Sequence, residues 1–330
     1  MAGCWPLCEN HLRRQTVTDP EVPERGWRER LELWFFHFAA GGLVPARWYL
    51  PELPPPEQRA ARSGHLRLEI VSHCWRYAHL LAYQLSSLVL YPPTRLEVTV
   101  TVFHAAEDED TVALLAFFGA LRVPGVSWNW RVLQRGHLYR RAIGRNLAAR
   151  ATRCDWIWFT DCDVVFHAGC LDGLAAALQG RRDTLVFPRV EHCTGLLQPT
   201  DPLLQATRGP PRVVDIDRTR FSARQRDRAT GPLQVTHGDV ARACGYCAGL
   251  PVYQRPSRHW PKLREDRAFR WLLRSQGEPI DVPGVYRIQH LSKGRYRGNR
   301  LRIGLRSAIR RLQSHFRDRG PAVDTPRPPR

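Results

Sequence analysis

In the middle of the chain, short segments with the pattern of buried strands alternate with segments that have the apolar spacing of helices. Runs rich in β-branched and aromatic residues, typical of buried strands, lie at 66–72, 96–103, 126–132 and 156–160. Segments with the helical spacing of apolar residues lie between them, at 77–90, 110–121 and 137–152. Strands that alternate with helices usually pair in parallel through right-handed crossovers. The sequence therefore predicts an α/β fold with a mixed, mostly parallel sheet flanked by helices.

The pattern is less regular on both sides of this region. Before it, an amphipathic helical pattern at 28–38 is followed by a proline-rich linker at 51–56, and we treat residues 1–64 as an accessory segment without assigned chemistry. After the fourth strand we expect a helix at 171–178, a strand at 184–188, a helix at 263–273 and a strand at 279–290. Residues 191–232 have no clear period, which indicates a long functional or mobile loop.

The C-terminus is strongly basic. From Arg287 to Arg330 the chain has 13 Lys or Arg against two acids, so this segment holds +11 of the formal charge of +19. A basic amphipathic helix is predicted at 300–317, followed by a disordered tail at 319–330. The predicted organisation is an accessory segment (1–64), a main domain (65–295) and a basic helix with its tail (296–330).

The fourth predicted strand ends in two acids one residue apart, Asp161 and Asp163. Alternate side chains of an extended chain lie on one face, so we expect both carboxylates to project in the same direction past the strand's end. Two carboxylates that close repel each other unless a divalent cation or hydrogen-bond donors share the site. Ligands of open α/β sheets bind at this edge, which favours a metal–diphosphate site. The simpler alternative is an acidic turn without function.

Composition limits the class of protein. Hydrophobic residues make up 43% and aromatic residues 10% of 330 residues, which indicates a folded, enzyme-sized protein. Only two of the 50 basic residues are lysines, and such one-sided arginine usage makes the charge a poor indicator of nucleic-acid binding. Nine cysteines, no signal-peptide pattern and no apolar run long enough for a bilayer predict a cytoplasmic protein with free thiols. Cys244-Gly-Tyr-Cys247 has no second pair at zinc-finger spacing, so a structural zinc is not predicted.

Three further segments have residues suited to chemistry. Arg140–Ala149 is an arginine-containing helix directly before the strand that ends in the acid pair, and guanidinium groups suit a diphosphate because they are planar and always charged. Trp260–Trp271 contains an adjacent acid pair at the start of a helix, and Val285–Lys293 places a histidine at the end of a strand. The alternatives are a solvated basic helix face, acids that merely favour the helix dipole, and a structural histidine.

With these segments and the acid pair, residues 66–295 resemble glycosyltransferase family 2, whose members have the GT-A fold. The resemblance implies a nucleotide-binding half first, a D-x-D motif after the fourth strand and an acidic pair in the acceptor half. It implies an enzyme dependent on Mn²⁺ or Mg²⁺ that moves a sugar from a nucleoside-diphosphate-sugar donor to an acceptor hydroxyl, with inversion. The acceptor, whether a glycan, a lipid or a small molecule, stays open.

The resemblance also implies roles for individual residues. Those expected to contact the nucleotide-sugar are Ser72, Arg141, Arg145, Asn146 and Asp161. Those expected to bind the metal are Asp161, Asp163 and His290, because oxygen and imidazole ligands suit these cations. Asp266 or Glu265 would be the general base, with Asp266 favoured. One departure is His104, which stands where the family usually has the aspartate that reads the nucleotide base, so the base stays open.

Two other classes of protein fit parts of the sequence. A haloacid-dehalogenase-type phosphatase shares the apolar-D-x-D-x-V pattern of 159–165, but that motif normally opens its domain, and here three strand–helix units precede it. Arg-rich segments at 218–228 and 295–330 favour nucleic-acid binding, but no aromatic residues are interleaved there in a stacking pattern. We therefore expect no nucleic-acid partner. The basic C-terminal helix would instead allow peripheral contact with anionic lipid at the inner face of the membrane.

Overall fold

The computed structural model describes residues 26–50, 52–258 and 264–291, and within them seven strands form a main sheet. The strands, in spatial order, are β10 (Glu278–Ile280), β6 (Leu185–Pro188), β9 (Gln234–His237), β4 (Trp156–Phe159), β1 (Leu66–His73), β2 (Leu96–His104) and β3 (Val126–Val132). β9 is antiparallel to β4 and β6, and the other neighbours are parallel. The predicted fold class, α/β with a mixed, mostly parallel sheet, is confirmed.

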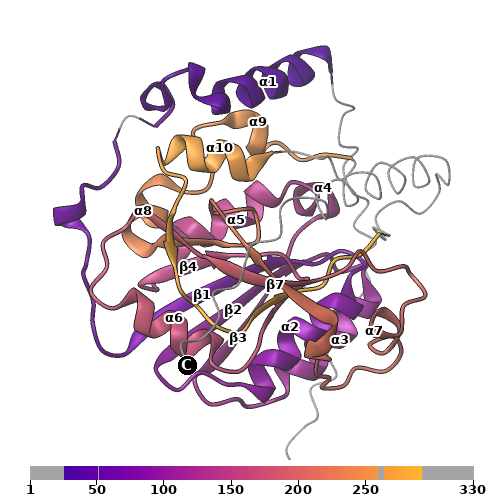
Figure 1. The fold of residues 1–330 in the computed structure, drawn as a ribbon. Coiled ribbons are helices and arrows are strands. Elements are labelled where there is room, and N and C mark those ends of the chain that lie inside the picture. Colours follow the sequence, from indigo (N-terminus) through magenta and orange to yellow (C-terminus); the bar gives the residue numbers. More distant parts are fainter. Residues whose placement is uncertain (1–25, 51, 259–263, 292–330) are drawn as a thin grey trace, which may run out of the picture.

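Helices cover both faces of the main sheet (Figure 1). On one face lie α2 (Ala78–Leu90), α3 (Glu109–Gly119) and α6 (Cys170–Leu178). On the other lie α4 (Arg135–Leu138), α5 (Arg141–Ala151), α8 (Gly238–Cys244), α9 (Pro251–Gln254) and α10 (Glu265–Leu272). Since both faces are covered, β1 is buried continuously from Leu68 to His73. This is why its sequence is a run of mostly apolar residues rather than an alternation.

One predicted helix is divided in the structure. The pattern at 137–152 predicts one helix, but α4 ends at Leu138 and α5 begins at Arg141. The backbone is not helical at Arg140 (φ −108°, ψ 84°), whose side chain is fully buried. Its guanidinium donates to Glu29 Oε1 (2.5 Å) and to the Arg255 carbonyl oxygen (3.0 Å). Tertiary bonds to a buried arginine therefore override the local helical pattern.

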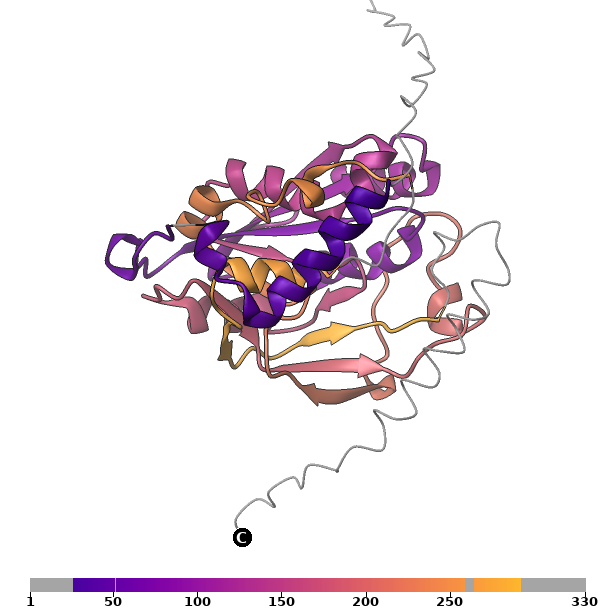
Figure 2. The same ribbon diagram turned by 90° about the horizontal axis from the view of Figure 1, so that it is seen from above.

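A second, four-stranded sheet lies beside the first (Figure 2). Its strands, in spatial order, are β5 (Val164–Phe166), β11 (Val285–Arg287), β7 (Val190–Thr194) and β8 (Phe221–Gln225), with α7 (Pro202–Gln205) in the connection from β7 to β8. The expectation of a loop over 191–232 is therefore wrong. β7 and β8 mix charged and apolar residues, and the buried carboxylate of Glu191 pairs with Arg226 and Arg287. Because charged residues lie among the apolar residues of these strands, and Glu191 occupies a buried position, their sequences lack the alternation of apolar and polar residues from which strands are predicted.

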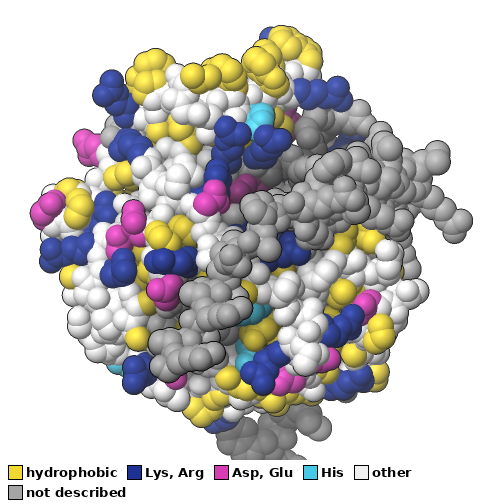
Figure 3. Space-filling view, viewed as in Figure 1, with side chains coloured by type: hydrophobic (Ala, Val, Ile, Leu, Met, Phe, Trp, Pro, Cys, Tyr) yellow, Lys and Arg dark blue, Asp and Glu magenta, His cyan; other side chains and the backbone are white. Residues whose placement is uncertain are grey.

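The N-terminal segment packs on α9 and α10. The predicted helix is present as α1 (Trp27–Phe38), followed by short helical turns at Ala39–Leu43, Ala46–Trp48 and Pro56–Gln58. Phe36 is buried, and its ring contacts those of Tyr49 and Tyr253. α1 is the outermost layer, above α10 (Figures 1 and 2), and large apolar side chains on its outer side are exposed to solvent (Figure 3).

Some predicted elements cannot be compared with the structure. The basic helix at 300–317 and the tail at 319–330 lie outside the described residues. Among the described helices, none has the length and hydropathy needed to cross a bilayer. All seven cysteines in the described part of the chain are buried and free of disulfide bonds.

Candidate functional site

The acid pair lies in a tight turn between β4 and β5, at the edge of the main sheet where β1 and β4 end. The Asp161 carbonyl oxygen accepts hydrogen bonds from Val164 N (3.2 Å) and from Gln84 Nε2 of α2 (2.9 Å). The Asp163 carbonyl oxygen accepts one from Ile288 N (2.9 Å). Three elements therefore fix the backbone of this turn, while both carboxylates remain partly exposed to solvent.

Two arginines of α5 contact the Asp161 carboxylate. Arg141 and Arg145 are one helical turn apart, so their side chains lie on one face of the helix. Arg141 forms an ion pair with Asp161, and Arg145 Nη2 lies 3.4 Å from the same carboxylate oxygen. The Arg141 side chain is 26% exposed, whereas that of Arg145 is 1% exposed. A bound ligand could therefore reach Arg141, while Arg145 stabilises the site from inside.

Arg145 links the acid pair to the helix that bears the second pair of acids. Its guanidinium donates to Tyr246 Oη (2.8 Å) and to the carbonyl oxygens of Thr160 and Gly231 (both 3.1 Å). Tyr246 Oη in turn donates to Gln234 Oε1 (2.8 Å). Gln234 Nε2 donates to the carbonyl oxygen of Asp266 (3.2 Å). A continuous chain of hydrogen bonds thus fixes the distance between the two acidic motifs.

Glu265 and Asp266, in the first turn of α10, have different environments. The Asp266 side chain is 33% exposed and forms an ion pair with Arg270 (3.2 Å). Glu265 is 4% exposed, and its Oε2 has no hydrogen-bond partner among the described residues. Burial raises the pKa of Glu265, although three nearby guanidinium groups, chiefly that of Arg141, act in the opposite direction. Asp266 is therefore the more accessible of the two acids.

A buried group of charges supports Asp163 from the second sheet. The Arg287 Nε atom lies 3.9 Å from the Asp163 carboxylate, and its Nη1 lies 3.4 Å from that of Glu191. Glu191 is fully buried and also pairs with Arg226. Because a buried carboxylate is stable only when it is paired, Glu191 holds Arg287 in place beside Asp163. The second sheet therefore positions the second acid of the motif.

The structure does not gather the predicted metal shell of Asp161, Asp163 and His290. The His290 ring packs against the Tyr77 ring (centroids 5.3 Å apart), and no three His, Cys, Asp or Glu side chains in residues 26–50, 52–258 and 264–291 lie close enough to share a metal ion. Mg²⁺, however, is usually bound by one or two carboxylates together with substrate phosphates and water. Asp163, with Asp161 beside it, fits that kind of shared site, and His290 is not needed for it.

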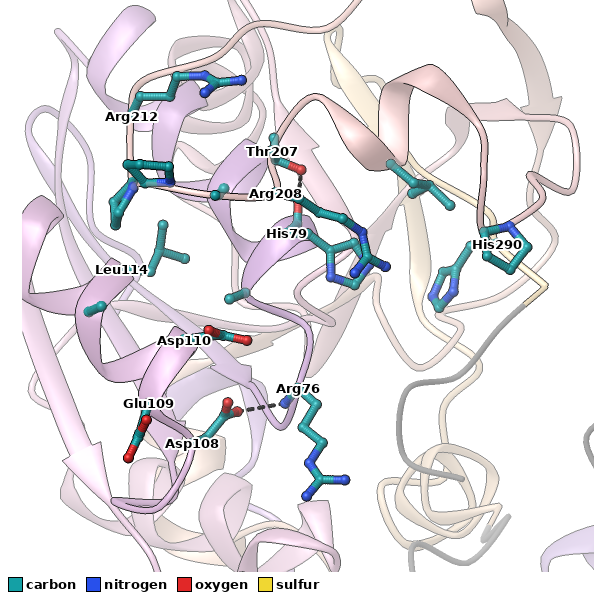
Figure 4. A pocket seen from close by; sticks show the side chains of 18 of the residues that line it. Arg76, His79, Asp108, Glu109, Asp110, Leu114, Thr207, Arg208, Arg212 and His290 are labelled. Atoms are coloured by element: carbon teal, nitrogen blue, oxygen red, sulfur yellow. Dashed lines mark hydrogen bonds between the residues drawn. The ribbon is translucent and has the colours of Figure 1, made fainter. Parts of the chain in front are cut away.

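His290 instead borders a charged cavity of about 730 Å³ (Figure 4). The cavity lies at the N-terminal ends of α2 and α3, where Arg76, His79 and Asp110 line it, and Arg208 closes it from the connection between β7 and β8. Burial and the Arg208 charge lower the pKa of His79 to about 4, so this imidazole is neutral at neutral pH. Sequence reasoning missed Arg76, His79 and Arg208, because they come from two distant segments without a shared motif.

Two residues expected to contact the nucleotide-sugar have side chains bonded inside the protein. Ser72 is fully buried, and its hydroxyl donates to Gln84 Oε1 (2.6 Å). Asn146 Oδ1 accepts from the backbone N–H of Tyr246 (3.0 Å). The structure therefore brings Asp161, Arg141 and Arg145 together and gives Ser72 and Asn146 positions behind them. His104, the departure from the family pattern, is also buried, and burial lowers its pKa.

His73 is a further buried residue beside the site that sequence reasoning missed. Its ring stacks on that of Phe103 (centroids 5.0 Å apart), and a Cβ added at Gly144 of α5 would lie 2.2 Å from its Nε2. Burial, together with the charges of Arg145 and Arg141, lowers its pKa well below the ordinary value, so the ring is neutral. The glycine at 144 is therefore what lets α5 approach β1 closely enough for its arginines to reach Asp161.

We expect Gly144→Ala to destabilise the fold, although alanine normally stabilises a helix interior by about 0.5–1 kcal/mol relative to glycine. The added methyl would overlap His73 and Phe103, which are too enclosed to move, at a cost of about 1–3 kcal/mol. Urea unfolding measures the change. Gly195→Ala is the matched control because a Cβ there meets nothing within 4 Å. A Gly144→Ala variant as stable as the control would show that α5 can move away from β1.

Comparisons with known proteins identify a family and some similar structures. The model of the glycosyl transferase family 2 matches residues 80–263. Among solved structures, a mannosyltransferase from Pyrobaculum calidifontis in complex with GDP-Man and Mn²⁺ is 18% identical, with a TM-score of 0.40, over 90% of this chain and 77% of that one. Residues 1–349 of S. aureus TarS in complex with UDP-GlcNAc are 11% identical, with a TM-score of 0.44, over 71% of this chain and 62% of that one. No curated protein sequence matches the chain.

Proposed function

We propose a reaction for this chain, which belongs to glycosyltransferase family 2 and is a glycosyltransferase with the GT-A fold. It would move a sugar from a nucleoside-diphosphate donor to an acceptor hydroxyl, with inversion. The observation that carries this proposal is the chain of hydrogen bonds from Asp161 through Arg145 and Tyr246 to α10. It connects two partly exposed carboxylates, those of Asp161 and Asp266, at one edge of the sheet. The family match sets aside the phosphatase and nucleic-acid alternatives.

The donor would bind at the acid pair. Arg141 would face the diphosphate, because its guanidinium is partly exposed and already beside Asp161. Asp161 would contact the ribose or share the cation. Mn²⁺ or Mg²⁺ would be held by Asp163, with Asp161 beside it, and would stabilise the negative charge of the departing diphosphate. Support for this comes from the partly exposed carboxylates and from the kind of site that Mg²⁺ prefers.

Asp266 would remove the proton of the acceptor hydroxyl. Inversion requires a base on the face of the sugar opposite the leaving diphosphate. A Cβ at Gly231 would lie 3.6 Å from the Asp266 Cβ, and the Gly231 carbonyl oxygen accepts from Arg145. The Asp266 side chain therefore lies next to Gly231, and Arg145 links Gly231 to the acid pair. Glu265, which is buried, would position α10.

The remaining parts of the proposal concern the organisation of the chain. We assign catalysis to residues 65–295 and an accessory role to residues 1–64. The free cysteines of the described part support a reducing, cytoplasmic location.

The experiment that tests this function is a thermal-shift screen with UDP, GDP, CDP and TDP, each with Mn²⁺ or with EDTA. We expect one diphosphate to raise the Tm, because ligand at about 100 times its Kd adds roughly 2.7 kcal/mol of stability. The shift should shrink in EDTA, and the matching nucleoside without phosphates is the control. The absence of a shift with all four diphosphates would contradict the proposal.

A further inference from the structure

Helix α1 exposes a stripe of large apolar side chains. Trp27 is 71% exposed, Leu31 57%, Trp34 64% and Phe38 48%. At 100° per residue these four positions fall within about 60° of one another around the helix axis. The Trp34 and Phe38 rings stack on each other, with centroids 6.0 Å apart. Figure 3 shows apolar surface along this outer margin of the molecule. We call these four residues the α1 stripe.

Among the described residues, α1 is attached to the protein mainly through the face opposite the stripe, where Phe36 is buried and Glu32 pairs with Arg255 (3.0 Å). Glu29 makes a second pair, with the buried Arg140 (2.5 Å). The contacts of the opposite face thus leave the stripe as apolar surface that is 48–71% exposed. Contiguous exposed apolar patches on soluble proteins usually mark a contact with a partner or a membrane.

The charges on α1 favour one kind of partner. Both acids of the helix face the protein and are paired there, whereas Arg28 and Arg30 are exposed beside the stripe. The apolar surface continues after the helix with Leu43 (70% exposed) and Trp48 (68%), where Arg47 is also exposed. Tryptophan and arginine around an apolar face are typical of helices that lie in the interface of an anionic bilayer.

We propose that the α1 stripe docks this protein onto the surface of an anionic lipid bilayer. The helix is the outermost layer of the fold, a ridge rather than a groove, so a flat surface can meet all four side chains at once (Figures 1 and 2). α10, which bears Asp266, lies directly beneath α1. Docking would therefore place the accessible carboxylate close to the lipid headgroups. The position of Asp266 near the headgroups points to an acceptor held in the membrane, and this step rests on the proposed function. The docking itself does not depend on the proposed function.

Sedimentation with large unilamellar vesicles tests the docking. The full chain is mixed with vesicles of phosphatidylcholine alone or with an equal part of phosphatidylglycerol. We expect pelleting with the anionic vesicles, and Trp27→Gln/Leu31→Gln/Trp34→Gln in one chain should weaken apparent binding at least about tenfold, since three apolar side chains no longer enter the interface. Leu90→Gln/Val132→Gln is the matched control, because both residues are exposed but belong to other elements, Leu90 to the end of α2 and Val132 to the end of β3, and it should pellet like the parent chain.

The readout requires no donor or acceptor, so failure of the docking and failure of the proposed function can be told apart. Equal pelleting of the parent chain and the α1 variant would overturn the proposal. It would also be overturned if the parent chain did not pellet but formed a dimer that the α1 variant lost, measured by analytical ultracentrifugation. Loss of pelleting through Leu305→Gln/Ile309→Gln, with the α1 variant unaffected, would assign lipid binding to the C-terminal segment instead.

Discussion

Asp163→Asn is expected to lower turnover about 10²–10³-fold, the size of effect seen when one preorganised group that stabilises the charge of the transition state is lost. The substitution keeps the shape of the side chain but removes the negative charge that would hold a divalent cation against the donor diphosphate. Turnover is measured as release of the nucleoside diphosphate that the thermal-shift screen identifies, with water as the acceptor where no other is known.

The fold should survive this substitution. The turn is held through the Asp163 carbonyl oxygen, which accepts from Ile288 N and does not depend on the side chain. Arg287 keeps its pair with the buried Glu191 when the Asp163 charge is lost. Asp155→Asn is the matched control, because Asp155 precedes the same strand at its other end and pairs with Arg62 (3.0 Å). Normal turnover of Asp163→Asn, with Mn²⁺ still required, would refute the role of Asp163.

The acid pair was predictable because its signal is local. The run from Trp156 to Phe159 is buried on both faces, so it is apolar without interruption, and the polar residues after it mark the edge of the sheet. The arginine helix before it was predictable for the same reason. Sequence reasoning therefore located Asp161 and Asp163 and the two arginines that contact Asp161, all within about 25 residues of the chain.

Long-range contacts were beyond such reasoning. Arg287 lies beside Asp163 only because β11 pairs with β5, and the partner that fixes it, Glu191, is 96 residues away. β9 has four residues, too few to show a period, yet it pairs with both β4 and β6 in the middle of the main sheet. Gln234 of β9 therefore entered the site unpredicted.

Two residues assigned by family resemblance alone have the expected position along the chain, but their side chains contact other parts of the protein. Ser72 directly precedes the end of β1, but the helices on both faces bury it, and its hydroxyl bonds to Gln84. His290 follows β11, yet its ring packs against that of Tyr77 and borders the charged cavity. A motif fixes a position along the chain, whereas the packing of neighbouring elements decides which way the side chain points.

The two acids of α10 should respond differently to neutral substitution, and the difference identifies the base. Asp266→Asn is expected to lower kcat about 10²–10⁴-fold, the usual contribution of a general base. Glu265→Gln should retain far more activity, because a side chain that is 4% exposed does not meet an acceptor hydroxyl. Comparing kcat for the two variants in one assay removes the uncertainty in the absolute rate.

Stability gives an independent readout for the same pair. Burial raises the pKa of Glu265 above its ordinary value of 4.5, so the folded state holds this proton more tightly than the unfolded state does. The stability that comes from the proton is present below pH 4.5 and is lost as the pH rises through the folded pKa. Glu265→Gln removes the ionisation, so its Tm should exceed that of the parent chain at neutral pH, with a difference that shrinks towards pH 4.5. If Glu265→Gln instead abolished turnover while Asp266→Asn kept it, Glu265 would be the base and the proposed direction of acceptor approach would be wrong.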